Sequence, residues 1–205
     1  MRKEFISAET IRDSALKLAH KMYKVDGFVP DIIYVSLRGG VYMGNVFSEY
    51  YKMVRALDGG RPVFYAAVVA RSYSDVRCQS KVMVDGWTYS PEYLRSGDKI
   101  LIVDDIFDTG KTVNALCDIV MQKGIPRSDI KIAVYDYKVP LYKKTEPLPV
   151  QPDYYCRKHI LNTPEDEVWI HYLCHEFVGL APDEIDQCYK DPEVRAILHE
   201  VRRDR

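Results

Sequence analysis

The chain has 205 residues, 47% of them hydrophobic, which is enough to bury the core of one ordinary domain or of a domain with a small appendage. Its 29 basic and 30 acidic residues leave a net charge of -1, which excludes a global field that would attract nucleic acid or an acidic membrane. No stretch approaches the roughly 20 apolar residues of a membrane span and no apolar run marks a signal peptide, so we expect a cytoplasmic protein with no nucleic-acid or membrane partner.

The first predicted element is an amphipathic helix that follows Ser7, a suitable N-cap residue, and ends near Gly27. Its apolar face is formed by residues three or four positions apart: Ile11, Ala15, Leu18 and Met22. Residues 31–36 then predict a buried strand. This strand leads through Arg38-Gly39-Gly40 into a second helix that ends near Leu57.

The middle of the chain predicts strands joined by a polar loop and a tight turn. Residues 63–70 form a strand pattern, and residues 71–80 form a polar loop. Residues 81–84 and 87–89 flank Asp85-Gly86, a pair that is typical of a hairpin turn. A β-hairpin is therefore expected over 81–89.

An alternation of strands and helices follows. The apolar run Ile100 to Val103 predicts a strand, a helix is expected from Gly110 to about Lys123 with Gly124 closing it, and Ile130 to Tyr135 predicts the next strand. Such an alternation implies parallel βαβ units. The fold class is therefore α/β, with a central, mainly parallel sheet flanked by helices.

The C-terminal third changes character after Lys138, where the chain becomes rich in proline as far as Pro152. Short strand candidates around 154–155 and 168–170 predict a small hood after the main sheet. Pro192 begins a predicted charged helix that runs to the end of the chain. We therefore expect a core domain over 1–138, a hood over 139–181 and a helical tail over 182–205.

The segment from Ile100 to Thr112 carries the strongest chemical pattern. Asp104 and Asp105 follow directly on the apolar run, and Asp108 comes three residues later. Parallel sheets bind ligands at the carboxyl ends of their strands, and the N-terminus of a helix offers free amides to a phosphate. The adjacent carboxylates suit vicinal hydroxyls or a hydrated Mg²⁺, and four following residues suit a phosphate: Thr109, Gly110, Lys111 and Thr112.

Two alternatives apply to this segment. The carboxylates could simply end a strand and cap the next helix. The ending Gly110-Lys111-Thr112 also occurs in the phosphate loop of nucleotide triphosphatases, but that loop needs a glycine where this chain has Asp105. The triphosphatase hypothesis is therefore excluded.

The complete string resembles the phosphoribosyl-pyrophosphate signature of type I phosphoribosyltransferases, and this resemblance implies the type I fold. It implies that Asp104 and Asp105 serve the ribose hydroxyls and the metal, and that the loop from Thr109 to Thr112 holds the 5-phosphate. Arg38 and Gly39 resemble part of the pyrophosphate loop of the family, and Ser72-Tyr73 resembles its mobile lid.

The resemblance extends to the purine branch of the family. It implies that Lys138 donates to O6 of the base, that Trp169 stacks on the base, and that backbone groups around Ile170 read its edge. An acidic residue that helps hold Mg²⁺ follows the aromatic residue in this branch, and Glu176 has that position. Trp169 could instead pack in a small hydrophobic core.

The chain departs from this pattern at Pro182, where the hypoxanthine-guanine branch has an arginine for pyrophosphate. Substitutes would be the basic residues nearby in sequence or in the lid: Lys190, Arg71 or Arg77. A separate metal hypothesis concerns residues whose spacing matches no standard zinc pattern: His171, Cys174, His175 and Cys188.

The implied reaction transfers phosphoribose from phosphoribosyl pyrophosphate to N9 of a 6-oxopurine in purine salvage, with Mg²⁺ as cofactor and Asp108 as the acid-base group at N7. The resemblance also suggests a homodimer or higher homo-oligomer. Two alternatives remain: a regulatory protein that senses phosphoribosyl pyrophosphate, and a transferase for another base such as uracil or adenine.

Overall fold

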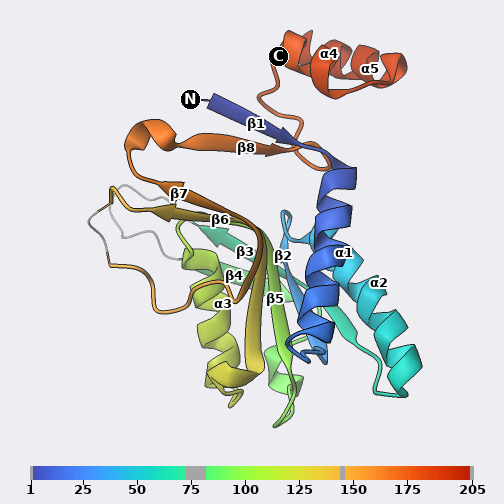
Figure 1. Cartoon of the computed structure of the whole chain (residues 1–205), viewed down its shortest axis with the longest axis vertical. Helices are drawn as coiled ribbons and strands as arrows, with labels where there is room; N and C mark the ends of the chain where they lie inside the picture. Colours follow the sequence, from blue (N-terminus) through green and yellow to red (C-terminus); the bar gives the residue numbers. More distant parts are fainter. Residues whose placement is uncertain (1, 73–81, 144–145, 204–205) are drawn as a thin grey trace. The chain divides into compact units, whose positions relative to one another are not determined.

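The computed structural model describes residues 2–72, 82–143 and 146–203. It contains two compact units, which we call unit 1 (residues 1–10 and 167–205) and unit 2 (residues 11–166). Unit 2 contains a six-stranded sheet with the order β4-β3-β2-β5-β6-β7, flanked by helices (Figure 1). The predicted α/β class is confirmed. Within the described ranges, every helix is too short or too polar to cross a membrane.

The elements of unit 2 follow one another as α1 (Ala8–Lys24), which begins in unit 1, β2 (Ile32–Leu37), α2 (Val41–Asp58), β3 (Phe64–Ser72), β4 (Val82–Trp87), β5 (Ile100–Phe107), α3 (Lys111–Gln122), β6 (Ile130–Pro140) and β7 (Tyr154–Leu161). Strands β3, β2, β5, β6 and β7 are parallel neighbours, and β4 runs antiparallel to β3. In a parallel sheet the carboxyl ends of the strands meet at one edge, which we call the carboxyl edge, and the opposite edge is the amino edge.

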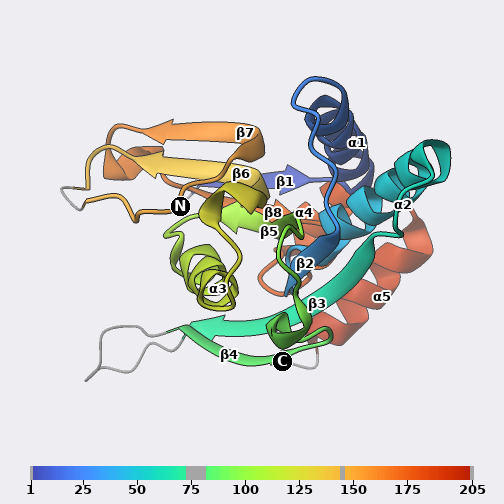
Figure 2. The same cartoon turned by 90° about the horizontal axis from the view of Figure 1, so that it is seen from below.

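Helix α3 lies within the concave side of the curved sheet, and α1 and α2 lie on its other side (Figure 2). Apolar residues of α3 pack on the sheet residues that point towards it, and all of them are buried: Val113, Leu116, Cys117 and Val120. Helix α2 approaches β2 closely at Gly44, where a Cβ atom would overlap the side chain of Val35. These contacts fix the sheet between its helices.

The first helix forms as predicted. The hydroxyl of Ser7 accepts a hydrogen bond from the backbone N–H of Thr10 at 3.2 Å, which is N-cap geometry. The four residues of the predicted apolar face are all buried. The predicted helix ends near Leu57 and Lys123 are also confirmed by α2 and α3, and Gly124 has the expected positive φ of 88°.

The predicted hairpin at Asp85-Gly86 is wrong. Strand β4 continues through both residues, and Gly86 does not have the positive φ that the predicted turn requires. Val69 pairs with Gly86 and Ala70 with Val84, so Asp85 is an extra residue on β4, a β-bulge. An Asp-Gly pair is compatible with a bulge as well as with a turn, because both depart from the regular geometry of a strand.

Three other boundaries differ from the predictions. Strand β3 continues through Ser72, in the predicted loop 71–80, because it pairs with β4; residues 73–80 lie outside the described residues. Strand β6 does not end near Tyr135 but runs to Pro140, because β7 pairs with it from Ala133 to Pro140. Strand β7, which was assigned to the hood, is therefore the edge strand of the main sheet.

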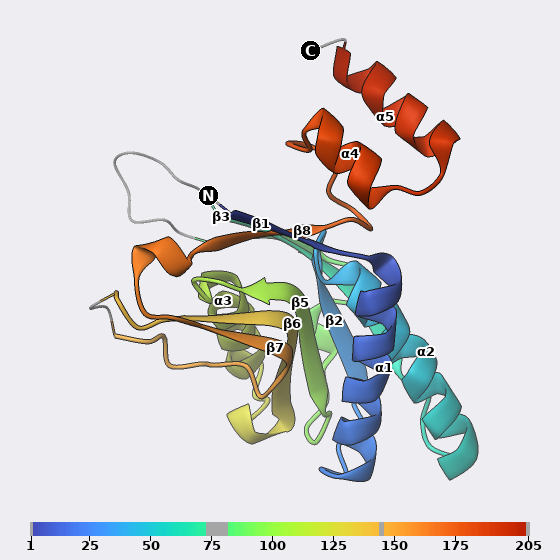
Figure 3. The same cartoon turned by 45° about the horizontal axis from the view of Figure 1, so that its top comes forward.

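Unit 1 consists of β1 (Arg2–Ile6), β8 (Val168–Tyr172), α4 (Pro182–Cys188) and α5 (Pro192–Arg203). Strands β1 and β8 form a parallel pair that joins the two ends of the chain, and neither β1 nor α4 was predicted. Helices α4 and α5 pack together, with His199 Nε2 2.9 Å from Asp186 Oδ1 (Figure 3). The predicted division into core, hood and tail stays a prediction.

Candidate active site

The motif from Ile100 to Thr112 runs along β5 and reaches the carboxyl edge of the sheet in unit 2 with its acidic residues and the start of α3. Strand β5 pairs with β2 only as far as Val103, but it pairs with β6 as far as Phe107. Beyond Val103, β6 therefore continues as a strand partner of β5 after the pairing with β2 has ended. A pocket of about 200 Å³ lies there, lined by Asp104, Asp105, Ile106, Asp108, Thr109, Gly110, Lys111, Thr112 and Val113.

Asp104 is the buried member of the acidic pair, with 9% of its surface exposed. Its Oδ1 accepts the backbone N–H of Asp105 at 3.1 Å, and Ser36 hydrogen-bonds to its side chain. Burial first, and then the charge of Asp105, raise the pKa of Asp104 well above its ordinary value. This environment favours a protonated Asp104. Ser36 belongs to the stretch that resembles the pyrophosphate loop, and its contact with Asp104 was not predicted.

Asp105 is the more accessible acid, and the loop after β2 packs directly against it. Its Oδ1 accepts the backbone N–H of Ile106 at 2.8 Å. A Cβ atom on Gly39 would overlap the carboxyl group of Asp105, and one on Gly40 would overlap the carbonyl oxygen of Val103. The predicted pyrophosphate loop and the predicted ribose acid are therefore neighbours, and glycine permits the contact.

The peptide bond between Leu37 and Arg38 is cis, and the side chain of Arg38 is exposed.

The start of α3 forms the predicted phosphate loop. Gly110 is its N-cap residue, with a φ of 73°, and a Cβ atom there would overlap the ring of Phe107. Thr109 and Lys111 are exposed and Thr112 is half-buried. Helix α3 has 12 residues, and the amides and the dipole at its N-terminus would favour a phosphate bound at this loop.

Asn114 holds this loop in place and was not predicted. Its Nδ2 donates to the carbonyl oxygens of Gly110 and Val150, both at 2.9 Å, and its Oδ1 accepts the N–H of Val150 at 3.0 Å. Asn114 is buried on a helix face that is otherwise apolar. A single amide in such a face is the sequence signal that could have identified it.

The register of β5 on β6 brings the predicted acid-base residue and the predicted base-binding lysine to the same place. The last registered pair is Phe107 with Tyr137; Asp108 directly follows the end of β5, and Lys138 is the next residue of β6. Neighbouring strands lie about 4.8 Å apart, so the two backbones are adjacent where the pairing ends. Asp108 is exposed, and Lys138 has 8% of its surface exposed.

The predicted base-stacking and second metal residues lie in unit 1. Trp169 is 54% exposed on β8, whereas Ile170 is 5% exposed on the opposite face. A Trp packed in a small core would be buried, so that alternative is wrong. Glu176 Oε2 accepts the N–H of Tyr172 at 3.0 Å and lies 3.9 Å from His171 Nδ1.

The magnesium role of Asp105 and Glu176 stays a prediction. Both residues fit it, because each is a partly exposed carboxylate. Mg²⁺ commonly takes one or two carboxylates together with substrate oxygens and water, so single acids of this kind fit it. Among the described residues, no three His, Cys, Asp or Glu side chains come together to hold a metal. This finding contradicts the alternative zinc set of His171, Cys174, His175 and Cys188.

Some predicted residues cannot be placed in the site. Ser72 is the last residue of β3, and Tyr73 and Arg77 lie outside the described residues. Pro182 is exposed at the start of α4, and Lys190 is exposed between α4 and α5. The lid and the substitute for the missing arginine stay predictions.

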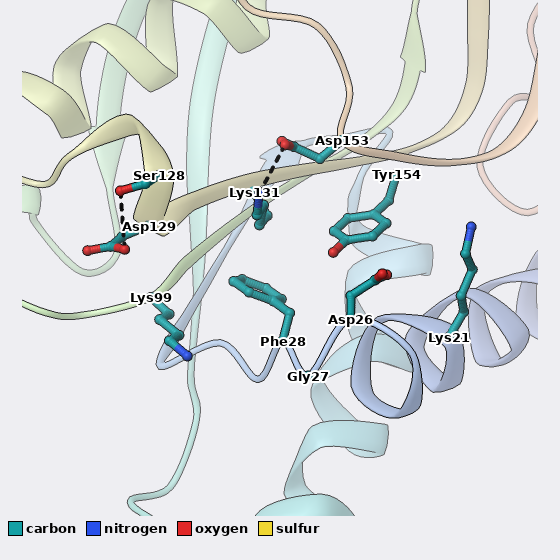
Figure 4. A pocket seen from close by; sticks show the side chains of 10 residues that line it. All are labelled: Lys21, Asp26, Gly27, Phe28, Lys99, Ser128, Asp129, Lys131, Asp153 and Tyr154. Carbon is teal, nitrogen blue, oxygen red and sulfur yellow. Dashed lines mark hydrogen bonds and ion pairs between the residues drawn. The ribbon is translucent and has the colours of Figure 1, made fainter.

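A larger cavity, of about 610 Å³, lies at the amino edge of the sheet (Figure 4). The carboxylates that line it are engaged within the protein. Lys131 Nζ lies 3.4 Å from Asp153, Ser128 donates to Asp129 at 3.5 Å, and Tyr154 bonds to Asp26. Phe28 is only 7% exposed and offers no open ring face. The smaller pocket at the carboxyl edge is therefore the candidate active site.

A family model described as "Phosphoribosyl transferase domain" matches residues 7–171. The bifunctional protein pyrR of Enterococcus faecalis (strain OG1RF) is 25% identical over 170 residues, which cover 82% of this chain and 88% of that protein.

Two solved structures are similar in fold. The purine phosphoribosyltransferase of Pyrococcus horikoshii Ot3 has a TM-score of 0.64 and 22% identity, covering 88% of this chain and 99% of that one. A hypothetical protein of Neisseria gonorrhoeae with bound ppGpp has a TM-score of 0.62 and 15% identity, covering 98% and 97%.

Proposed function

Because this chain belongs to the phosphoribosyl transferase domain family, we propose that it transfers the 5-phosphoribosyl group from phosphoribosyl pyrophosphate to N9 of a 6-oxopurine and releases pyrophosphate. The observation that carries the purine part is that Asp108 and Lys138 directly follow Phe107 and Tyr137, the last registered pair of β5 and β6. A carboxylate and an ammonium side by side match the N7 and O6 positions on one edge of a 6-oxopurine.

The phosphoribosyl part of the substrate is assigned to the loop of β5 and α3. The amides and hydroxyls from Thr109 to Thr112 would hold the 5-phosphate, and Asp105 would accept hydrogen bonds from the ribose hydroxyls. Gly39 lets the backbone of the preceding loop come close, and Arg38 extends a positive charge towards the pyrophosphate.

In the reaction, the bond between C1 of the ribose and the pyrophosphate oxygen breaks with both electrons going to pyrophosphate, and the lone pair of N9 forms the new bond. Asp108 takes or shares the proton at N7 as N9 becomes nucleophilic. Lys138 polarises O6, which favours a 6-oxopurine over adenine, and Trp169 supplies an exposed ring for stacking. Asp105 and Glu176 would each offer a carboxylate to Mg²⁺, which would neutralise charge on the pyrophosphate.

The test is turnover with phosphoribosyl pyrophosphate, Mg²⁺ and a panel of hypoxanthine, guanine, xanthine, adenine and uracil, with pyrophosphate release as the readout. We expect release with at least one of the three 6-oxopurines and little with adenine or uracil. Release with uracil or adenine alone would overturn the purine assignment and keep the transferase. Binding of phosphoribosyl pyrophosphate without release with any base would overturn the transferase itself.

A second candidate function is a phosphoribosyl-pyrophosphate-sensing regulator or a transferase for another base. It is favoured by the relatives named bifunctional protein PyrR, whose name states more than one function. The likeness to a protein with bound ppGpp adds a ligand that also combines a purine with pyrophosphate groups. Calorimetric titration with phosphoribosyl pyrophosphate and with ppGpp, alongside the turnover assay, separates a protein that only binds from one that catalyses.

A further inference from the structure

A buried charged cluster lies where β6 and β7 run side by side towards the carboxyl edge. Asp136 on β6 is 0% exposed. Its Oδ1 accepts hydrogen bonds from Arg157 Nε at 2.7 Å and from His159 Nε2 at 2.6 Å, and both donors belong to β7. A carboxylate only accepts, so the bonded nitrogen of His159 carries the proton.

A fully buried carboxylate needs a specific reason at this position, because taking its charge out of water costs several kcal/mol unless partners compensate. Here the two donors come from the edge strand of the sheet, and the guanidinium of Arg157 also lies 5.4 Å above the ring of Tyr135. Two short bonds to one oxygen fix the position of that oxygen more tightly than a single bond would. The cluster therefore places a negative charge at a defined point on one face of the sheet.

This point is next to Lys138. Lys138 follows Asp136 by two residues, so the strand period puts both side chains on one face of β6. In the parallel register Asp136 lies opposite Arg157, and Lys138 lies opposite His159. Strand β5 has ended at Phe107, so β7 is the neighbouring strand that flanks Lys138.

We propose that Arg157 and His159, acting through Asp136, position the ammonium of Lys138 for the base, and that β7 thereby helps determine base selectivity. The inference rests on the proposed function, in which Lys138 contacts O6. The side chains of Arg157, His159 and Lys138 share the surroundings of one carboxylate, so each donor that leaves increases its attraction for the others. Without the His159 bond, Asp136 draws Lys138 back along β6 and away from the base.

The test compares His159→Leu, which removes the donor, with His159→Gln, whose amide can donate at a similar reach. We expect the KM for hypoxanthine to rise about tenfold in His159→Leu and less than about twofold in His159→Gln. The KM for phosphoribosyl pyrophosphate should change less than about twofold in both variants, because the phosphate loop is on β5 and α3. Selectivity for hypoxanthine over adenine should fall in His159→Leu by a similar factor.

The matched control is Lys158→Leu, on the same strand between the two donors. Lys158 lies 5.3 Å from the ring of Tyr137 and 5.9 Å from that of Tyr155, away from Asp136. It should leave both KM values unchanged. A purely structural role of β7 would give a different result. Lys158→Leu and His159→Leu would then both lower the melting temperature, and neither would raise the KM for hypoxanthine more than the KM for phosphoribosyl pyrophosphate.

Arg157→Lys provides a second variant in case His159→Leu does not fold; it keeps the charge and loses the Nε bond, and the same separation of KM values is expected. An unchanged KM for hypoxanthine, or an equal rise in the KM values for hypoxanthine and phosphoribosyl pyrophosphate, would overturn the inference. The proposed function would still hold in that case, provided that the wild-type protein turns over a 6-oxopurine. Wild-type protein that turns over no 6-oxopurine would overturn both.

Discussion

The two edges of the sheet in unit 2 carry similar residue types and use them differently. At the amino edge, Asp98 is 5% exposed and bonds to Arg61 at 2.5 Å and to the N–H of Arg95 at 2.8 Å. At the carboxyl edge, Asp108 is exposed at the end of β5, beside a helix N-terminus. Carboxylates that stabilise the fold are held by several donors, whereas the group proposed for chemistry is left open to a ligand.

The cavities follow the same division. The larger one, at the amino edge, is lined by side chains that bind one another, and Asp153 there accepts bonds from Arg127, from Lys131 and from the N–H of Ile132. The smaller pocket gathers the residues of one contiguous motif with a buried acid whose pKa is raised. The chemistry of the lining residues therefore identifies the site better than the cavity volume does.

The largest effect is expected from Asp108→Asn at the carboxyl edge. The amide keeps the shape but cannot take the proton at N7, so turnover should fall about 10²- to 10⁴-fold. The dissociation constant for phosphoribosyl pyrophosphate and the melting temperature should stay close to those of the wild type. Asp118→Asn, an exposed acid on α3, is the control and should keep its turnover. Normal turnover of Asp108→Asn would remove Asp108 from the mechanism.

The opposite result is expected at the amino edge for Asp98→Ala. Arg61 keeps its contact with Asp31 at 3.2 Å, but it loses Asp98, as does the N–H of Arg95, so the free energy of unfolding should fall by about 1–2 kcal/mol. The kcat/KM of the folded fraction should be unchanged. Urea unfolding measures the first quantity, and Asp129→Ala, a partly exposed acid at the same edge, should lose less than about 0.5 kcal/mol. Lost activity with unchanged stability would contradict the division between the edges.

Gly39→Ala sharpens the comparison, because it should affect binding without unfolding the protein. The new Cβ atom would overlap the carboxyl group of Asp105, and the short side chain of Asp105 can rotate away from it. We expect the KM for phosphoribosyl pyrophosphate to rise about tenfold. Gly86→Ala, where a Cβ atom meets nothing within 4 Å, is the control. A variant that lost stability while keeping this KM would show that Gly39 is needed for folding alone.

Local patterns could be read from the sequence because neighbouring residues determine them. The strand, acids and helix start between Ile100 and Thr112 form one continuous segment, and the Ser7 cap needs only the next helical turn. The failures concern pairing between distant segments. Whether Asp85-Gly86 turns or bulges depends on the register with β3, and whether β7 joins the sheet depends on β6.

The site residues show the same limit. Asn114 and the cluster around Asp136 act through partners 36 and 21 to 23 residues away, so no short motif contains them. Gly39 resembled a loop residue in the sequence, and only the structure gives the reason, since the backbone of that loop touches Asp105. The roles of Trp169 and Glu176 stay predictions.

The smallest effect concerns Asp104, which should destabilise the fold when it ionises because its side chain is buried beside Asp105. Its raised pKa means that, between an ordinary aspartate pKa of about 3.9 and the raised value, the folded state holds a proton that the unfolded state has lost. Stability should therefore fall as pH rises through this window, and the loss is complete above the raised pKa.

Asp104→Asn stays neutral and keeps an oxygen for the N–H of Asp105, so at pH 8 its free energy of unfolding should exceed that of the wild type by about 1 kcal/mol. This advantage should vanish towards pH 4. Urea unfolding across that range tests it, with Asp118→Asn as the exposed control, and equal pH slopes for Asp104→Asn and the wild type would mean that Asp104 is ionised in the fold without penalty.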